Sequence, residues 1–497
     1  MSDVILAIDE GTTNAKVVCV NRDGAILSSA ARALQLVHPQ AAWAEQDPQA
    51  ILEAVSDAAA EAIANLGAGA SIAAVGISNQ RESVVAWERE SGLPLSPVVV
   101  WQCRRSEAFC EELAASEHAD SIREKTGLPI DPLFPAAKIR WLLQHIDNGH
   151  ARAANAEICI GTIDSWLVWH LSGGRHFVTD ASNASRTQLF NIHTLQWDEA
   201  LLELYGVPLA CLAKVLPSSA ERGTTDGYRG IPSGLPLLSQ IGDSHAALYG
   251  QGGFMDGITK ATYGTGSSLM STVATLDKQD YRLAHTVAWH DGNVRFGLEG
   301  NITHTGAAVD YVARLLGVGD AAAVAELADT TQSTEGVYFV PALSGLAAPH
   351  WDSKARGIIT GLTESAGPAQ VARASMESIA YQVADVVEAM AEIAGSRLER
   401  LLVDGGPTRN QWLMQFQANL LDRPIARASN AEVSAIGAAY LAGKALGWWP
   451  TNEALQALHR KVDIIEPDSN RPRVQQGYEG WKQSLHRAAS NLDPTRP

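Results

Sequence analysis

One pattern of residues occurs twice in this chain of 497 residues, once near its start and once just past its middle. In each copy an apolar segment leads into a short polar tip of small residues, and a second apolar segment follows. The first copy covers residues 4–8, 11–14 and 17–20, and the second covers residues 257–261, 262–268 and 269–273. Apolar segments bounded by turn residues are typical of buried strands, so each copy predicts a β-hairpin with a polar tip. The recurrence predicts a duplicated fold.

The segments around the hairpins predict α/β domains with mixed sheets covered by helices. Asp47 followed by Pro48 is a typical helix start, and the helix should run to residue 65, before a strand at residues 72–77. Further strands are expected at residues 25–27, 98–100, 158–160, 286–289, 294–298 and 337–340, and further helices at residues 135–146, 162–171, 305–316, 369–394, 410–421 and 434–446. We predict two similar domains, residues 1–250 and residues 251–497, which share an interdomain cleft because no low-complexity linker separates them.

The composition argues against several classes of protein. Lys and Arg number 38 against 55 Asp and Glu, and the net charge of −17 disfavours binding to nucleic acid or to an anionic membrane surface. No segment reaches the ~18 uninterrupted apolar residues of a membrane span, and the first residues do not resemble a signal peptide. The five cysteines, an odd number without a CxxC pair, indicate reduced thiols and give little support to a zinc site. We expect a cytoplasmic protein.

The two hairpin tips combine backbone N–H groups and hydroxyls without bulky side chains, which suits the oxygens of a nucleotide phosphate. Beside the first tip, Asp9 is placed to hold Mg²⁺ through water, and Lys16 is placed to neutralise phosphate charge. Either tip alone is also an ordinary turn. The repetition favours phosphate binding, because two such tips facing each other would clamp a triphosphate.

Polar side chains also lie at predicted strand ends, where ligand crevices form in α/β folds. Arg81 and Glu82 combine a donor with an acceptor, as a pair of neighbouring hydroxyls requires, and a surface ion pair is the alternative. Trp101 either walls a small pocket or belongs to the core. The polar loop at residues 179–186 either lines the same cleft or only turns the chain.

Asp243 lies at a predicted strand-to-helix junction just before the boundary between the domains. It is either a helix N-cap or the base that accepts a proton from an attacking hydroxyl during phosphoryl transfer. A third glycine-rich strand end, at residues 401–410, would let the backbone approach a purine or ribose, although other strand-to-helix loops look similar. The chain contains no GxxxxGK[ST] and no complete GxGxxG before a helix, which disfavours P-loop enzymes and nicotinamide dehydrogenases.

Together these motifs resemble the FGGY carbohydrate kinases, and within that family the glycerol kinases. The resemblance covers essentially the whole chain. It is carried by residues 9–16, 79–82, 101–105, 242–243, 263–266 and 404–406 and by the family's signatures at residues 135–142 and 357–377. It implies two actin-like (ribonuclease H-like) domains that close on ATP, Mg²⁺ and a small polyol or sugar. It also implies a homo-oligomer, either a dimer or a tetramer.

The resemblance assigns roles by motif position. Asp243 would be the general base, and Arg81, Glu82 and Asp243 would grip substrate hydroxyls beside Trp101. Asp9 would organise Mg²⁺. The residues that would surround the phosphates and the rest of the nucleotide are Thr12, Thr13, Asn14, Lys16, Thr265, Gly306, Asp310, Gly406 and Asn410.

Three positions in or beside the expected substrate pocket depart from the glycerol kinase pattern: Leu133 stands in place of a Tyr, Ser244 in place of a Gln and Ser268 in place of a Phe. Loss of a phenol and a phenyl leaves a wider cavity with fewer fixed contacts, which a longer polyol or an open-chain sugar would fill. We expect an ATP-dependent kinase for a terminal hydroxyl of a small polyol, with glycerol as the first candidate acceptor. The alternatives are a four- or five-carbon polyol or ketose, such as erythritol, threitol or xylulose, and, remotely, an actin-like ATPase without a metabolic acceptor.

Overall fold

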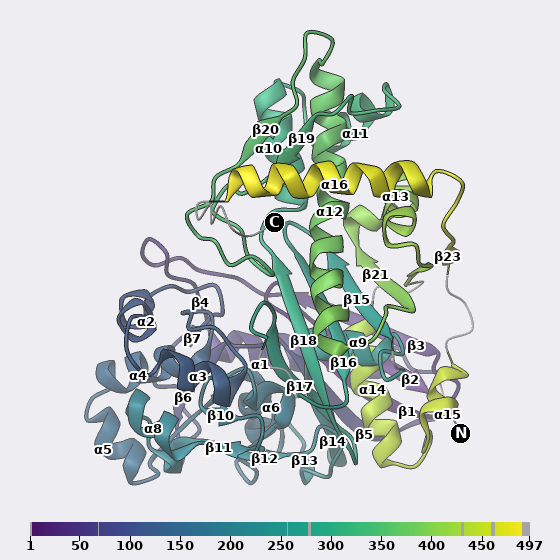
Figure 1. Cartoon of the computed structure of the whole chain (residues 1–497). Helices are drawn as coiled ribbons and strands as arrows, with labels where there is room; N and C mark the ends of the chain where they lie inside the picture. Colours follow the sequence, from purple (N-terminus) through teal and green to yellow (C-terminus); the bar gives the residue numbers. More distant parts are fainter. Residues whose placement is uncertain are drawn as a thin grey trace.

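A computed structural model describes the chain except for Met1 and residues 68, 256, 277–279, 429–431, 459–462 and 490–497. Two large mixed sheets form the framework, and helices cover them (Figure 1). In spatial order the first sheet consists of β13 (Thr224–Asp226), β14 (Ser233–Gly242), β5 (Ala70–Asn79), β1 (Ser2–Glu10), β2 (Asn14–Asn21) and β3 (Ile26–Ala33). The second consists of β17 (Ala284–His290), β18 (Val294–Ile302), β16 (Ser267–Val273), β15 (Ile258–Tyr263), β21 (Arg400–Gly405), β22 (Ile425–Arg427) and β23 (Asp463–Ile465).

Each sheet is built around one of the two predicted hairpins. In the first sheet β1 and β2 are antiparallel and β3 extends the hairpin, while β5 lies parallel to β1 and β14 parallel to β5. In the second, β15 and β16 are antiparallel and β18 extends the hairpin, while β21 lies parallel to β15 and β22 parallel to β21. The predicted duplicated α/β fold with mixed sheets is therefore confirmed by strand order and strand direction.

The predicted helices are present because their start signals are local. The Asp47 carboxylate caps the first helix and accepts hydrogen bonds from the backbone N–H groups of Gln49 and Ala50 at 2.8 and 3.4 Å. The helices that the sequence predicts are α1 (Pro48–Ala64), α4 (Pro135–His145), α6 (Ile163–Leu171), α10 (Gly306–Leu316), α12 (Pro368–Ala394), α13 (Gln411–Leu421) and α14 (Val433–Ala445). The others are α2 (Glu107–Ala114), α3 (Ala119–Thr126), α5 (Gly149–Ala154), α7 (Ala181–Ala184), α8 (Glu199–Tyr205), α9 (Asp243–Gly250), α11 (Ala321–Asp329), α15 (Asn452–Gln456) and α16 (Arg471–Ala488).

Smaller sheets connect these elements. One contains β4 (Glu45–Gln46), β7 (Val98–Val99), β6 (Val84–Glu88) and β8 (Ile158–Thr162). The two-stranded pairs are β10 (Phe190–Asn191) with β11 (Gln196–Trp197), β9 (Val178–Asp180) with β12 (Lys214–Leu216), and β19 (Tyr338–Val340) with β20 (Ile358–Thr360). None of the helices in the described ranges is long and apolar enough to cross a membrane. All five cysteines are free thiols and buried.

The strand β3 is longer than the predicted segment at residues 25–27. It continues to Ala33, and along it buried residues alternate with exposed ones. The prediction stopped early because a strand with one solvent face has no continuous apolar run. The hydroxyl of Ser28 points to α1 and donates to the backbone carbonyl of Ala62 at 2.7 Å. The alternation therefore packs one face of β3 on a helix.

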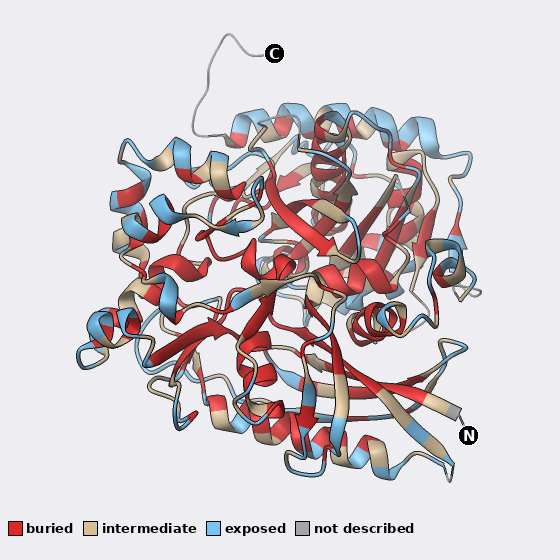
Figure 2. Cartoon of the chain, turned by 90° about the horizontal axis from the view of Figure 1, so that it is seen from below, coloured by how far each residue is buried: buried red, intermediate tan, exposed pale blue. Residues whose placement is uncertain are grey.

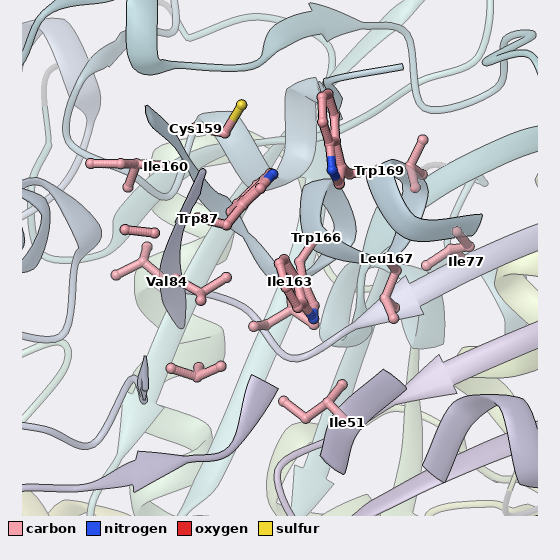
Figure 3. Close-up of a cluster of buried hydrophobic side chains, with 14 of the residues drawn as sticks. Ile51, Ile77, Val84, Trp87, Cys159, Ile160, Ile163, Trp166, Leu167 and Trp169 are labelled. Carbon is pink, nitrogen blue, oxygen red and sulfur yellow. The ribbon is translucent and has the colours of Figure 1, made fainter. Parts of the chain in front are cut away.

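A cluster of aromatic side chains fills the core between the small sheet and α6 (Figure 3). Trp87 on β6 meets Trp166 on α6 edge to face, with ring centroids 5.3 Å apart, and Phe177 at 5.2 Å. Such pairs add to the stability that burial provides. In the view from below, buried residues run through the centre of the molecule and exposed residues lie on the outer faces of the peripheral helices (Figure 2). The small sheet is thereby fixed beside the first large sheet.

One helix of the second half packs on the first sheet. The helix α14 contacts β1, β5 and α9, and Figure 1 shows it beside the N-terminal strands. The helices α9 and α14 approach closely because each has a glycine at the contact. A Cβ on Gly437 would lie 1.9 Å from the carbonyl oxygen of Ala246, and one on Gly250 would lie 2.3 Å from that of Val433. The domain boundary after residue 250 stays a prediction, and α14 joins the two halves across it.

We expect Gly437→Ala to destabilise the protein by about 1–3 kcal/mol, because the added methyl group overpacks the contact between α9 and α14. The matched control is Gly319→Ala, where nothing lies within 4 Å of the added Cβ. Thermal unfolding followed by circular dichroism measures both variants. Equal unfolding temperatures for the two would contradict the importance of this close approach.

Candidate active site

Three parallel strands of the first sheet end at the same edge. The strand β5 pairs with β1 on one side and with β14 on the other, up to the last residue of each strand. Residues at or just after these ends therefore converge, although they are far apart in sequence. Asp9 lies near the end of β1, Arg81 and Glu82 follow β5, and Asp243 follows β14.

Five side chains form what we call the charged cluster: Arg81, Glu82, Arg186, Asp243 and Glu299. Arg81 donates two hydrogen bonds to the Glu299 carboxylate, at 2.8 and 3.1 Å, and its Nε lies 3.3 Å from an Asp243 oxygen. Arg186 nitrogens lie 2.5 Å from oxygens of both Glu82 and Glu299. Arg81 and Glu82 are thus buried and bound to other partners, so the alternative of a surface ion pair between them is wrong. Arg186 also shows that the polar loop at residues 179–186 reaches this site.

Glu299 is a candidate that the sequence reasoning missed. It lies on β18 of the second sheet and is fully buried, so it brings the second half of the chain to the charged cluster. Burial by itself would raise its pKa, but the Arg186 and Arg81 guanidiniums hold the pKa of Glu299 well below its ordinary value. The available signal was an acidic residue directly after the predicted strand at residues 294–298, which the structure extends to Ile302. A carboxylate buried there needs cationic partners.

Asp243 is the first residue of α9, and the N-cap of that helix is Gly242, so the interpretation of Asp243 as an ordinary N-cap is wrong. One carboxylate oxygen accepts the backbone N–H of Ser244 at 2.6 Å. The Asp243 side chain is 36% exposed, whereas that of Arg81 is 9% exposed. Partial burial raises the pKa of Asp243, while the Arg81 guanidinium opposes that increase. A carboxylate with a raised pKa that an incoming hydroxyl can reach suits a general base.

Two carboxylates at this edge fit a divalent cation. The pKa of Asp9 is raised to about 6. Burial raises it most and the charge of Asp243 adds to the increase, while the hydrogen bond from the Ser78 hydroxyl at 2.8 Å opposes it. A cation beside Asp9 and Asp243 would relieve this repulsion. Among the described residues no set of three or more His, Cys, Asp or Glu forms a metal site of its own. Mg²⁺ is commonly held by one or two carboxylates together with phosphate and water oxygens, so these two residues fit an ion that binds with a nucleotide.

Two of the predicted acceptor residues adjoin acidic members of the charged cluster. Ser244 follows Asp243 in sequence, and the Ser268 hydroxyl lies 3.4 Å from a Glu299 oxygen. Both serines are partly buried. They place small hydroxyl groups where the resemblance leads to the expectation of a large amide and a phenyl ring.

Leu133 and Trp101 reach the same region through hydrogen bonds of the backbone. The buried ammonium of Lys138 donates to the carbonyl oxygens of Leu133 and Glu82, at 2.6 and 2.8 Å. The backbone N–H of Trp101 donates to the Ser83 hydroxyl at 3.1 Å. The structure thus brings all the predicted acceptor residues into one region around the charged cluster.

The two hairpin tips present unused donors. No described residue accepts a hydrogen bond from the backbone N–H groups of Thr12 and Thr13 in the first tip, or of Thr265 and Gly266 in the second. The second tip rests on the start of α10, where the Gly306 N–H donates to a tip carbonyl at 3.0 Å. These N–H groups suit phosphate oxygens.

Two other predicted phosphate residues lie on β2. The amide of Asn14 is exposed and donates to the Thr13 hydroxyl at 3.1 Å. The Lys16 ammonium lies 2.5 Å from a Glu432 carboxylate oxygen just before α14. Lys16 therefore has an anionic partner from the second half of the chain.

The remaining nucleotide candidates form a separate group. Asp310 is exposed on α10, and Gly406 begins a short 3₁₀ turn after β21. The side chain of Asn410 caps α13 by accepting the backbone N–H of Leu413 at 3.0 Å. Within the described residues no hydrogen bond joins Asp310, Gly406 or Asn410 to the charged cluster.

Comparison with known proteins gives this geometry a context. The profile of the FGGY family of carbohydrate kinases, N-terminal domain, matches residues 4–250, and that of the C-terminal domain of the family matches residues 259–446. This chain belongs to the FGGY family of carbohydrate kinases. It is therefore an ATP-dependent kinase that phosphorylates a sugar or polyol, which excludes the actin-like ATPase without a metabolic acceptor.

Relatives of this FGGY kinase cover almost its whole length. It is 54% identical to the apulose kinase of Pectobacterium atrosepticum, over 98% of both chains. It is 44% identical to the glycerol kinase of Symbiobacterium thermophilum, over 97% of this chain and 98% of that one. A crystal structure of Plasmodium falciparum glycerol kinase with ADP has a TM-score of 0.93 at 29% identity and covers 99% of both chains. The fold prediction and the family resemblance are confirmed.

We expect Glu299→Gln to destabilise this FGGY kinase by about 3–5 kcal/mol, because Arg81 and Arg186 lose a buried counter-charge. The KM for the acceptor should rise as well, since Arg81 loses the carboxylate that orients it. Denaturant unfolding and steady-state kinetics measure the two effects. The matched control is Glu53→Gln, whose exposed ion pair with Arg229 should contribute less than about 1 kcal/mol. A similar small loss at both positions would contradict the role of Glu299.

Proposed function

We propose that the acceptor of this FGGY kinase is a four- or five-carbon sugar or polyol, with the branched ketose apulose as the first candidate in place of glycerol. The observation that carries this proposal is the small size of the side chains at three acceptor positions. The three positions carry Leu133, Ser244 and Ser268. None of these side chains has the phenol, large amide or phenyl ring that would enclose a three-carbon chain. The Ser244 and Ser268 hydroxyls offer hydrogen-bond partners for additional oxygens of a longer acceptor.

Sequence similarity supports the same acceptor class. Identity is 54% with the relative named apulose kinase and 44% with a relative named glycerol kinase, at nearly equal coverage. Apulose is a ketose with more carbons and hydroxyls than glycerol. It would occupy the space that the missing aromatic groups leave beside Glu299.

In the proposed reaction the oxygen of a primary hydroxyl of the acceptor attacks the γ-phosphorus of ATP, and Asp243 accepts the proton of that hydroxyl. The bond between the γ-phosphorus and the bridging oxygen breaks, and ADP leaves. The reach of its carboxylate and its raised pKa support this role. Arg81 donates to an acceptor hydroxyl, and Glu82 accepts from another. Because Glu299 and Arg186 hold these two side chains, the acceptor would meet an ordered binding surface.

The nucleotide would lie across the two hairpin tips. The unused N–H groups of Thr12, Thr13 and Thr265 support phosphate binding there, with Asn14 and Lys16 beside the first tip. Gly306, Asp310, Gly406 and Asn410 would hold the rest of the nucleotide. Mg²⁺, held by Asp9 with the phosphates, would supply neutralisation of phosphate charge. A dimer or tetramer stays a prediction from the family resemblance, and a cytoplasmic location stays a prediction from the sequence composition.

We expect kcat/KM for apulose to exceed that for glycerol at least tenfold, which corresponds to about 1.4 kcal/mol in transition-state binding. A coupled assay of ADP release across apulose, erythritol, threitol, xylulose, ribulose and glycerol measures this.

Ser268→Phe should lower kcat/KM for apulose at least tenfold, because the phenyl ring fills the space that apulose would occupy. The matched control Ser268→Ala should have a smaller effect. Glycerol as the leading acceptor would overturn the proposal and leave the kinase chemistry intact.

Replacement of the proposed base tests the mechanism separately. We expect Asp243→Asn to lower kcat about 10²–10⁴-fold, because the amide cannot take the proton, while KM for the acceptor changes little. Rapid-quench kinetics with the best acceptor of the panel measure the chemical step. Asp226→Asn, which alters an exposed ion pair with Arg175, is the control. Normal turnover in Asp243→Asn would exclude Asp243 as the base.

A further inference from the structure

Gln80 lies beside Arg81, yet the proposed reaction gives it no task. Its side chain is buried, with 1% of the residue exposed. The amide nitrogen donates to Glu10 and to Gln46, both at 2.8 Å, and the amide oxygen accepts from the hydroxyls of Ser83 at 2.9 Å and Thr12 at 3.4 Å. Both donors and both lone pairs of the amide are thus used, so its orientation is fixed.

Both hydroxyls that Gln80 binds also contact Trp101. The indole N–H of Trp101 donates to the Thr12 hydroxyl at 2.9 Å, and its backbone N–H donates to the Ser83 hydroxyl at 3.1 Å. Because Thr12 accepts from the indole and donates to Gln80, its single hydroxyl proton has a defined direction. Trp101 therefore belongs to the same network as the first hairpin tip.

The backbone of the tip is held by the same network. Gln46 receives a hydrogen bond from Gln80 and donates its own amide N–H to the Thr12 carbonyl at 2.8 Å. Glu10, the last residue of β1, receives the other N–H of the Gln80 amide. The peptide and the side chain of Thr12 are therefore both oriented by groups that meet at Gln80.

We propose that Gln80 is a positioning residue that couples the acceptor pocket to the first phosphate tip. An acceptor that packs on Trp101 holds the indole against Thr12, and Thr12 then presents its backbone N–H to the phosphates with less loss of conformational freedom. Bound acceptor thus tightens the binding of ATP, and bound ATP tightens the binding of the acceptor by the same factor. This inference rests on the proposed roles of Trp101 and Thr12.

The test measures how tightly the protein binds AMP-PNP, a non-hydrolysable ATP analogue, in the presence of Mg²⁺. Binding without acceptor is compared with binding at saturating apulose and, separately, with binding at saturating glycerol. Isothermal titration calorimetry gives the ratio of the two dissociation constants, which we call the coupling factor. In the unchanged protein we expect a factor of at least about 5 with the better acceptor. A purely structural role of the network predicts the same factor with and without the Trp101 indole N–H.

Trp101→Phe keeps an aromatic ring and removes the indole N–H that binds Thr12. We expect its coupling factor to fall below about 2, even where acceptor affinity changes, because saturation removes the affinity from the ratio. The matched control is Trp197→Phe, which removes a different indole hydrogen bond, to the Ala213 carbonyl at 2.9 Å, and should keep the coupling factor of the unchanged protein. Gln80→Met, if it folds, should behave as Trp101→Phe does.

The outcomes for the coupling and for the acceptor are separate. No coupling with either acceptor in the unchanged protein, or an undiminished factor in Trp101→Phe, would overturn the inference. Turnover of the acceptor panel by the unchanged protein tests the proposed function alone, because that measurement does not involve the coupling factor or the variants.

Discussion

The double ion pair of Glu299 with Arg81 and Arg186 is the interaction on which the arrangement of this kinase depends. The carboxylate comes from the second sheet and is fully buried, while both guanidiniums come from the first half of the chain. A buried charge without its partners is strongly unfavourable, so the two halves are constrained to meet with these side chains in register. The same contact fixes Arg81 beside Asp243 and Arg186 beside Glu82.

The duplicated hairpin gives each half a phosphate-binding candidate, but the two halves differ in what they place beside it. In the first half the parallel strands β1, β5 and β14 direct carboxylates and guanidiniums to one edge. In the second half the tip rests on α10, and glycine-rich backbone follows β21. In the proposed function the acceptor and the proton transfer therefore belong to the first half, and the bulk of the nucleotide belongs to the second.

Specificity and coupling can be separated in this structure. In the proposed function Ser244 and Ser268 provide hydroxyls in place of bulky side chains and determine which acceptor fits. Gln80, in contrast, touches neither expected substrate and acts through Thr12 and Trp101. A kinase of this type could therefore exchange its acceptor by changes at the pocket wall while the network behind the wall stays the same.

The sequence by itself determined the elements whose signals are local. Apolar runs with polar tips predicted both hairpins, Asp47 with Pro48 predicted the start of α1, and the order of motifs predicted the kinase family. The tertiary structure decided what those signals leave open: Glu299 as the partner of Arg81, and Gln80 as the centre of a hydrogen-bond network. Hairpins and caps depend on neighbours within a few residues, whereas the partner of a buried charge or amide depends on which distant elements the tertiary fold brings together. Residue 81 meets residue 299 only because the two halves of the chain pack together, and no spacing along the chain encodes that contact.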